Sequence, residues 1–292
     1  MNTVPMLETV LKITLVIFMF GNMLDLGLRL DLRKALQGLR DVRFVTLTLF
    51  WGYIVCPALG YWLAVALPLS PAYAMALILV SMVPGNPFLT TAVSKARADL
   101  NYAGTFMLLS SLVTVVYMPF MVPVLVKGLS ATPWMIAKPM LVLILLPMVV
   151  GVIFRLWRES IAAKVQPFVK KATGLDTLVM LLLLLGVYGK GLISSVGTFA
   201  LGSQVLVVAV IAAAAYWLGF GMPKPQKQIL VLGLCCRNVG AALAPLFIAP
   251  NVDPDAIVAT GALGTFVVIG SSLIAASMFA KQGDRDAAGA SA

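Results

Sequence analysis

Histidine is absent from this chain, and cysteine and charged side chains are scarce. The 292 residues include no histidine and three cysteines, and only 11% of them are charged. No Ser-His catalytic pair can form without histidine. The cysteines Cys56, Cys235 and Cys236 lie in apolar stretches with no CxxC spacing. These absences exclude Ser-His hydrolases and argue against a structural zinc or haem site, so we expect neither a metal nor a cofactor.

Hydrophobic residues are the abundant class. They make up 61% of the chain and give a mean hydropathy of +1.02, whereas a soluble chain is about half apolar and about a quarter charged. The composition is typical of an all-α polytopic membrane protein and leaves no room for a separate soluble domain. The net charge of +10 is interpreted as basic loops beside the lipid bilayer, and not as a nucleic-acid site.

Apolar runs of spanning length, separated by charged or Pro/Gly-rich breaks, predict nine transmembrane helices. The first run carries Glu8 and lacks a small-residue cleavage pattern, so it is interpreted as a span and not as a signal peptide. The predicted spans lie near 5–28, 43–68, 72–96, 101–126, 135–155, 173–193, 201–221, 227–249 and 256–280.

Lys and Arg are distributed unevenly between the predicted loops. Sixteen lie on one side of the topology, and only Lys127, Lys138 and Lys190 lie on the other. Because cytoplasmic loops are enriched in basic residues, this split places the N-terminus outside and the C-terminus in the cytoplasm. We therefore expect a multi-pass protein of the cell (inner) membrane.

Two pairs of spans resemble each other and predict an inverted repeat. The stretch 104-GTFMLLSSL-112 matches 264-GTFVVIGSSL-273 at GTF and again at SSL. Each stretch follows a span with a broken centre, at 84-PGNP-87 and at 237-RNVG-240. By the charge count the two stretches cross the membrane in opposite directions.

The two breaks indicate a substrate site near the middle of the membrane. A broken helix leaves backbone polar groups that are tolerated only where they line a cavity or meet protein or ligand. In the first break Asn86 can cap the second half-helix, with Pro87 at its first position. Paired interrupted helices in inverted repeats are typical of secondary transporters. The predicted helix-breaking residues are Pro84, Gly85, Pro87 and Gly240.

Three stretches resemble the bile acid:sodium symporter family and its wider superfamily. They are 17-IFMFGNMLDLGLRL-30, then 84-PGNP-87 with 95-KARADL-100, and 237-RNVGAALA-244. The resemblance covers nearly the whole chain and implies one transporter unit, residues 1–292, in which a panel domain moves against a core with two crossing helices. In the nine-span version the panel helices lie near 5–28, 135–155 and 173–193. The core helices lie near 43–68, 72–96, 101–126, 201–221, 227–249 and 256–280.

The same resemblance implies sodium sites, and nearly all of their ligands are replaced here. We therefore regard sodium as doubtful and expect transport that does not depend on it in the family's manner. Leu89-Thr90 stands where the family has Ser-Asn, Ala103 and Met107 where it has hydroxyls, Gly233 and Arg237 where it has Glu and Gln before the retained Asn238, and Val268-Ile269 where some members have His-Asn.

Arg237 falls in the second break, where a charge in mid-membrane costs several kcal/mol unless it has partners. A guanidinium only donates hydrogen bonds and cannot coordinate sodium. It can replace the ion by bonding carbonyls at the half-helix ends, or it can pair bidentately with a carboxylate or sulfonate. The alternative is a purely structural arginine, buried against Asp25 or carbonyl groups.

The remaining candidates are polar residues near the two breaks. Threonines in membrane helices commonly bond carbonyls of their own helix, so that alternative stays open for each of them. Asp25, close to Arg29, is interpreted as a solvated interfacial charge, with proton transfer as the alternative. The predicted substrate-binding residues are Asn86, Thr90, Thr91, Thr105, Arg237, Asn238 and Thr265.

The sequence thus predicts a secondary active transporter for a small organic anion, working by alternating access. An arsenite-type metalloid efflux carrier is an alternative, because such carriers share the superfamily and use thiols, here Cys235 and Cys236. An intramembrane enzyme would need paired aspartates, a Ser-Lys arrangement or a metal set inside the spans, and the sequence shows none. A channel would need an open polar stripe, which the few charges do not supply.

Overall fold

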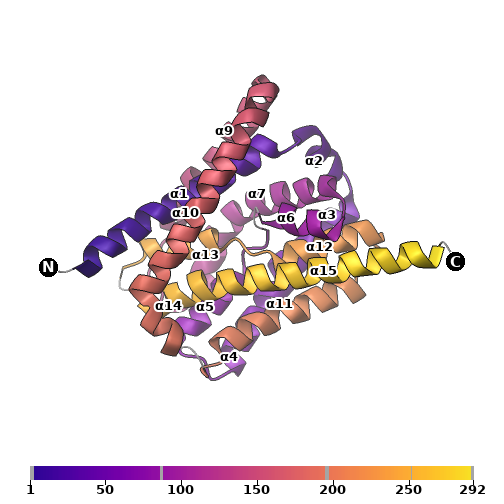
Figure 1. Cartoon of the computed structure of the whole chain (residues 1–292). Helices are drawn as coiled ribbons and strands as arrows, with labels where there is room; N and C mark the ends of the chain where they lie inside the picture. The colour runs from indigo at the N-terminus through magenta and orange to yellow at the C-terminus, as the bar shows by residue number, and fades with distance from the viewer. Residues whose placement is uncertain (1–2, 86–87, 195–196, 251, 291–292) are drawn as a thin grey trace.

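The computed structural model describes residues 3–85, 88–194, 197–250 and 252–290 (Figure 1). Within these ranges the chain forms helices and connecting loops, with an isolated pair of extended residues at Pro84 and Arg237. Asn86 and Pro87 lie outside the described residues. Among the described residues, six helices are long and apolar enough to cross a membrane: Thr9–Arg29, Val42–Ala66, Leu100–Leu125, Pro133–Trp157, Ala200–Trp217 and Pro254–Asp286.

Several of these long helices are composites of α-helix with one π-helical turn. The segment from Val42 joins α3 (Val42–Leu49), η1 (Phe50–Val55) and α4 (Cys56–Ala66). The next composite joins α8 (Pro133–Met140), η2 (Leu141–Leu145) and α9 (Leu146–Trp157), and the last joins α14 (Pro254–Val258), η3 (Ala259–Leu263) and α15 (Gly264–Ala290). In the first two, proline follows the π turn, as Pro57 and Pro147. Proline has no N–H for the regular ladder, and a π turn accommodates that loss without ending the helix.

Two further segments are interrupted, as the sequence predicts. One consists of α5 (Pro71–Ser81) and α6 (Leu89–Ala96), and the other of α12 (Lys224–Cys235) and α13 (Val239–Ile248). Gly240 was predicted to break the second segment, and this was wrong, because it is helical within α13. The Asn238 side chain accepts a bond from the Ala241 N–H at 3.1 Å and so starts the helix before Gly240. Gly240 instead lies against Met19 of α1 (Thr3–Arg29), where a Cβ would approach Met19 Cγ to 2.9 Å.

Helices α1, α9 and α10 (Glu159–Ser194) form one group, which lies along one side of the molecule in Figure 1. Glycine permits the close approach of α1 to α9, since a Cβ on Gly151 would lie 2.8 Å from the carbonyl oxygen of Leu24. The α10 helix begins at Glu159, well before residue 173, where the predicted span starts. The intervening residues include three Ala and three Lys, which are good helix formers, while the charged lysines make the stretch too polar to be predicted as a span.

The helices outside this group surround the two interrupted segments, and several of them meet at Asp41. Asp41 caps α3 by accepting from the Phe44 N–H at 3.1 Å, and it also accepts from Gln226 of α12 at 2.6 Å. Tyr102 of α7 (Leu100–Leu125) donates to the same carboxylate at 3.3 Å. The Phe44 amide lowers the pKa of Asp41 against the opposing effect of burial, and the Gln226 and Tyr102 donors lower it further. This network ties α3, α7 and α12 together at one end of the bundle.

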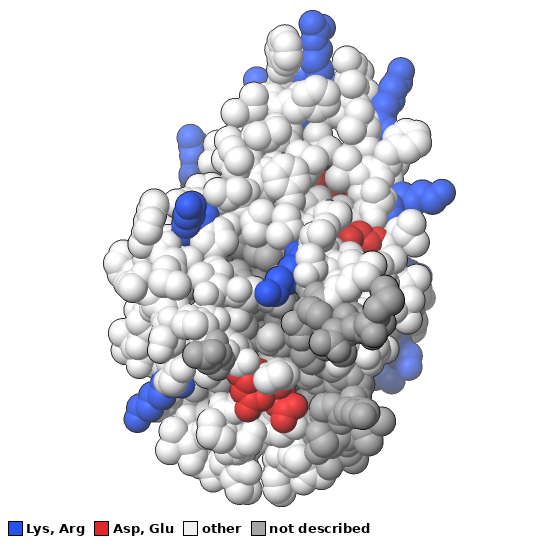
Figure 2. Space-filling view, turned by 90° about the vertical axis from the view of Figure 1, so that its left-hand side faces the viewer, with Lys and Arg blue, Asp and Glu red and all other residues white. Residues whose placement is uncertain are grey.

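The outer surface suits contact with lipid. Large apolar side chains are exposed on the outer helices, for example Ile153 at 58% and Leu182 at 60%. On the face drawn in Figure 2 most of the described surface carries neither basic nor acidic side chains. In a soluble protein such a surface would drive association, whereas in a bilayer it is the expected exterior.

Candidate functional site

The two interrupted segments cross, and their extended residues bond to each other. Gly85 donates its N–H to the carbonyl oxygen of Cys236 at 2.7 Å, and Asn238 donates to that of Val83 at 2.9 Å. Gly85 has a φ of +85°, a conformation that side chains with a Cβ rarely adopt. Each break thus satisfies backbone groups that the other break exposes, so the crossing is a small polar centre inside an apolar bundle.

Arg237 is at the centre of this crossing and is completely buried, with 0% exposure. Its Nη2 donates to the Cys56 sulfur at 2.9 Å, and its Nη1 lies 3.5 Å from the carbonyl oxygen of Ser81. Ser81 is the last residue of α5, so this carbonyl belongs to the negative end of a half-helix. The guanidinium therefore lies where a cation is favoured by the dipole of the broken helix.

Phe106 fills the space beside Gly233, one of the positions where the family resemblance implies a sodium-binding acid. A Cβ on Gly233 would lie 2.5 Å from Cε1 and 2.6 Å from Cε2 of the Phe106 ring, and the ring is fully buried. The same ring faces Gly85 of the first break, where an added Cβ would lie 3.2 Å from Phe106 Cε1. Phe106 thus packs against both interrupted segments, and its ring is apolar.

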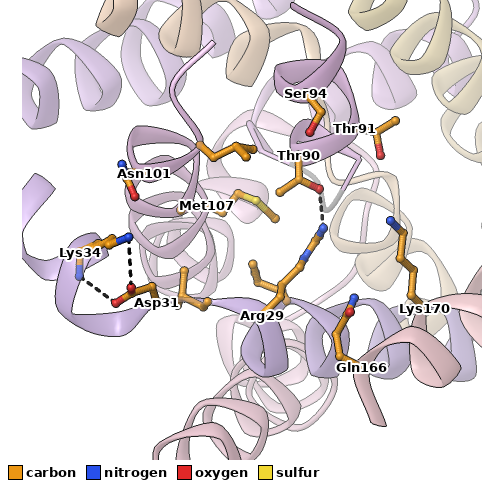
Figure 3. Close-up of a pocket in the computed structure, with 14 residues that line it drawn as sticks. Arg29, Asp31, Lys34, Thr90, Thr91, Ser94, Asn101, Met107, Gln166 and Lys170 are labelled. Carbon is orange, nitrogen blue, oxygen red and sulfur yellow. Dashed lines mark hydrogen bonds and ion pairs between the residues drawn. The ribbon is translucent and has the colours of Figure 1, made fainter. Parts of the chain in front are cut away.

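A cavity of about 530 Å³ opens between helices α1 and α10 on one side and helices α6 and α7 on the other. Its wall combines cationic side chains with hydroxyl and amide groups (Figure 3). Cations outnumber acids among the lining residues, which favours an anion as the occupant. The lining residues are Leu26, Arg29, Leu30, Asp31, Lys34, Thr90, Thr91, Ser94, Leu100, Asn101, Gly104, Met107, Gln166 and Lys170.

Arg29 connects the two walls of this cavity. Its Nε lies 3.3 Å from Asp25 Oδ2, one turn earlier on α1, and its Nη1 donates to the Thr90 hydroxyl of α6. Gln166 of α10 donates to the other Asp25 oxygen at 2.6 Å. The interpretation of Asp25 as a solvated interfacial charge was wrong, because the residue is only 4% exposed. A cation one turn away and an amide donor together compensate for its burial.

The predicted threonines occupy three kinds of place. Thr90 and Thr91 line the cavity. Thr105 is buried and donates to the carbonyl oxygen of Ala35 at 3.3 Å and to that of Asn101 at 3.2 Å. Thr265 donates to a carbonyl of its own segment at 2.6 Å. Asn238 caps α13 beside Arg237. The structure therefore places Arg237 and Asn238 at the crossing and Thr90 and Thr91 at the cavity, whereas Thr105 and Thr265 belong to neither.

The three cysteines are buried and are not disulfide-bonded. Cys56 meets Arg237, and the Cys236 sulfur lies 3.1 Å from the Ser272 hydroxyl. Over the part of the chain that the structure describes, no three Cys, Asp or Glu side chains gather as a metal site would require.

Sequence reasoning missed Arg29, Lys34, Gln166 and Lys170 as parts of a site. The cationic residues among them lie at span ends, where the positive-inside rule explains basic residues without any ligand. The signal that distinguishes Arg29 is its position one turn after Asp25, which allows an ion pair that leaves a guanidinium at a cavity wall. Gln166 gives no comparable signal, because only the packing of α10 on α1 brings it to Asp25.

Comparison with known proteins agrees with this architecture. A family model described as the sodium bile acid symporter family matches residues 16–195. The chain is 27% identical over 212 residues to a protein of Oryza sativa subsp. japonica named probable sodium/metabolite cotransporter BASS2, chloroplastic. That match covers 69% of this chain and 47% of the relative, so the chain spans about half the length of this relative. Because the family model matches more than half of its residues, this multi-pass membrane protein belongs to the sodium bile acid symporter family, which is a family of transporters and not of enzymes.

Proposed function

We propose that the protein is a secondary transporter that carries a small organic anion by alternating access, with Arg237 in place of a bound sodium ion. The observation that carries the proposal is the fully buried guanidinium at the crossing of two broken helices. A buried cation persists only where its surroundings compensate its charge. Among its surroundings here are the negative carbonyl end of a half-helix, with the Ser81 oxygen at 3.5 Å, and the Cys56 sulfur, a weaker acceptor. Cations outnumber acids in the lining of the cavity beside α6, and this supports a negatively charged substrate.

Nine spans in two inverted repeats are the arrangement that we propose for this transport. Helices α1, α9 and α10 pack together as a panel would, and the two interrupted segments cross within the remaining helices as a core would. Both observations support a panel that borders the cavity on one side while the core, through α6 and α7, borders it on the other. Movement of the core against the panel would then expose the crossing to one side of the membrane at a time.

The orientation that follows has the N-terminus outside and the α9–α10 corner in the cytoplasm. Ala163 is exposed beside that corner, and Ser130 is exposed in the connection between α7 and α8. With a membrane-impermeant maleimide on intact cells, Ser130→Cys is expected to be labelled, and Ala163→Cys only after permeabilisation. The buried native cysteines give a low background. Labelling of Ala163→Cys in intact cells would overturn the orientation and the proposed inversion of the repeats.

Substrate binding is expected to be independent of sodium. Phe106 occupies the space beside Gly233, and Leu89, which replaces another implied ligand, is fully buried. Arg237 brings a permanent positive charge and cannot coordinate a cation. The crossing therefore lacks ligands that the resemblance implies for sodium, and its charge disfavours a second cation. The rice relative carries sodium in its name, so coupling is the point on which this chain is proposed to differ from it.

A thermal-shift screen of small carboxylates and sulfonates, in matched sodium and choline buffers, tests the function and its coupling together. At least one organic anion is expected to stabilise the protein, with affinities in the two buffers that agree within about a factor of two. Neutral analogues of the same anion, such as its amide, are the matched control and are expected to have no effect. A steep dependence on sodium would show that Arg237 does not replace the ion.

A further inference from the structure

Asp25 contacts Arg29 in the way that the carboxylate of a bound ligand would. Asp25 is buried, and its carboxylate approaches Arg29 Nε at 3.3 Å while Gln166 holds the other oxygen at 2.6 Å. Arg29 also lines the cavity. The Asp25 carboxylate thus already engages the Nε side of the guanidinium, with which a carboxylate in the cavity would also pair.

Arg29 also carries a bond between the two proposed domains. Its Nη1 donates to Thr90 of α6 (Figure 3). Asp25 and Gln166 instead belong to α1 and α10. Bidentate pairing with a carboxylate uses two N–H groups side by side on the guanidinium fork. An anion that pairs with Nη1 and Nη2 displaces Thr90 from Nη1, and its negative charge competes with Asp25 for the same guanidinium.

The other cations of the cavity are placed differently. Lys34 has a side chain 58% exposed and lies 3.7 Å from Asp31, and Lys170 is exposed on α10. Exposed cations attract anions over a distance but hold them weakly, because water screens the interaction. Arg29 has a side chain only 19% exposed, so it is the cation at which a bound anion would gain most.

We propose that Asp25 is an internal stand-in for the substrate's carboxylate, and that an entering organic anion takes Arg29 from Asp25 and Thr90. The exchange makes Arg29 a substrate-binding residue. It also breaks the side-chain bond between α1 and α6, so binding would release the core to move. This proposal rests on the proposed function and adds to it the residue that receives the anion in the cavity.

Binding affinities of matched variants test the exchange. The probes are choline salts of acetate, pyruvate, succinate, benzoate and methanesulfonate, titrated calorimetrically into the purified full-length protein. Asp25→Asn removes the competing charge and is expected to tighten binding of whichever probe binds by about tenfold, equivalent to about 1.4 kcal/mol. Arg29→Gln, alone or with Asp25→Asn, is expected to weaken binding by at least about tenfold.

Glu159→Gln is the matched control, because it also removes the acidic partner of an arginine on the same helix group, Arg155 at 3.6 Å. The Glu159 side chain is 77% exposed and away from the cavity lining, so its loss is expected to leave affinity unchanged. Should Asp25→Asn fail to fold, Thr90→Val replaces it. That variant removes the α6 bond without a change of charge and is expected to tighten binding about threefold.

Two failures are distinguishable. If a probe binds the wild type and Asp25→Asn leaves its affinity unchanged, or Arg29→Gln binds as the wild type does, the exchange is wrong and the proposed function stands. If no probe binds the wild type, Asp25→Asn or Glu159→Gln, both the exchange and the assignment of an organic-anion substrate are wrong.

Discussion

Replacement of Arg237 by glutamine is expected to abolish anion binding or to make it dependent on an added cation. The guanidinium supplies the positive charge at the crossing, and glutamine keeps the polar character but removes that charge. The bond to Cys56 and the approach to the Ser81 carbonyl are lost with it. We expect a loss of affinity of at least about tenfold, measured by thermal shift with the anion that stabilises the wild type.

Two further variants separate charge from geometry at this position. Arg237→Lys keeps the charge but loses the planar fork, so it is expected to recover only part of the binding. Cys56→Ser keeps an acceptor for Nη2 and is the matched control, with little change expected. Full stability and full binding in Arg237→Gln would mean that the arginine is only a tolerated structural residue.

Gly233→Leu is expected to prevent the crossing from packing. A Cβ there already meets the Phe106 ring at 2.5 Å. Gly233 belongs to α12 of one interrupted segment, and the same ring packs against Gly85 in the break of the other. Overpacking costs about 1–3 kcal/mol or more, and Phe106→Ala alone costs about 3–5 kcal/mol by the cavity it leaves. The double variant, Gly233→Leu with Phe106→Ala, is expected to lose less stability than the sum of the two single losses, measured as the unfolding midpoint in detergent.

Gly202→Leu is the control for this pair. It lies on α11 (Ala200–Trp217), and apart from its chain neighbours and the backbone of its own helix no atom of the described residues lies within 4 Å of an added Cβ, so leucine is expected to be tolerated there. Additive losses in the Phe106–Gly233 double variant would contradict the view that the ring fills the space beside Gly233.

The interrupted segments could be predicted from the sequence, because proline, glycine and asparagine in mid-span leave few other local structures. Pro84 and Gly85 lie in the first break, and Asn238 caps the second half-helix of the other segment. The position of Gly240 could not be predicted this way. A glycine near a break resembles a breaker, whereas here it makes room for Met19 of a distant helix.

The cavity could not be predicted from the sequence for a related reason. A basic residue at the end of a span has an adequate explanation in membrane topology, which conceals a second role for Arg29. Buried Asp25 accepts a hydrogen bond from Gln166, 141 positions away along the chain. Periodicity and loop charge carry no information about such a contact, so Asp25 was predicted to be a solvated charge. By contrast, the charge of Arg237 in an apolar run was informative, because no topological rule explains it.

Counterflow in proteoliposomes tests the central claim most directly. Vesicles with wild-type protein or Arg237→Gln are loaded with the unlabelled anion identified by thermal shift and diluted into traces of labelled anion, in choline and in sodium buffers. An alternating-access carrier exchanges one for the other, so the wild type is predicted to accumulate label transiently above equilibrium to about the same level in both buffers. Arg237→Gln is predicted not to accumulate label in choline. Accumulation by the wild type only in sodium, or equal accumulation by Arg237→Gln in choline, would contradict the replacement of sodium by Arg237.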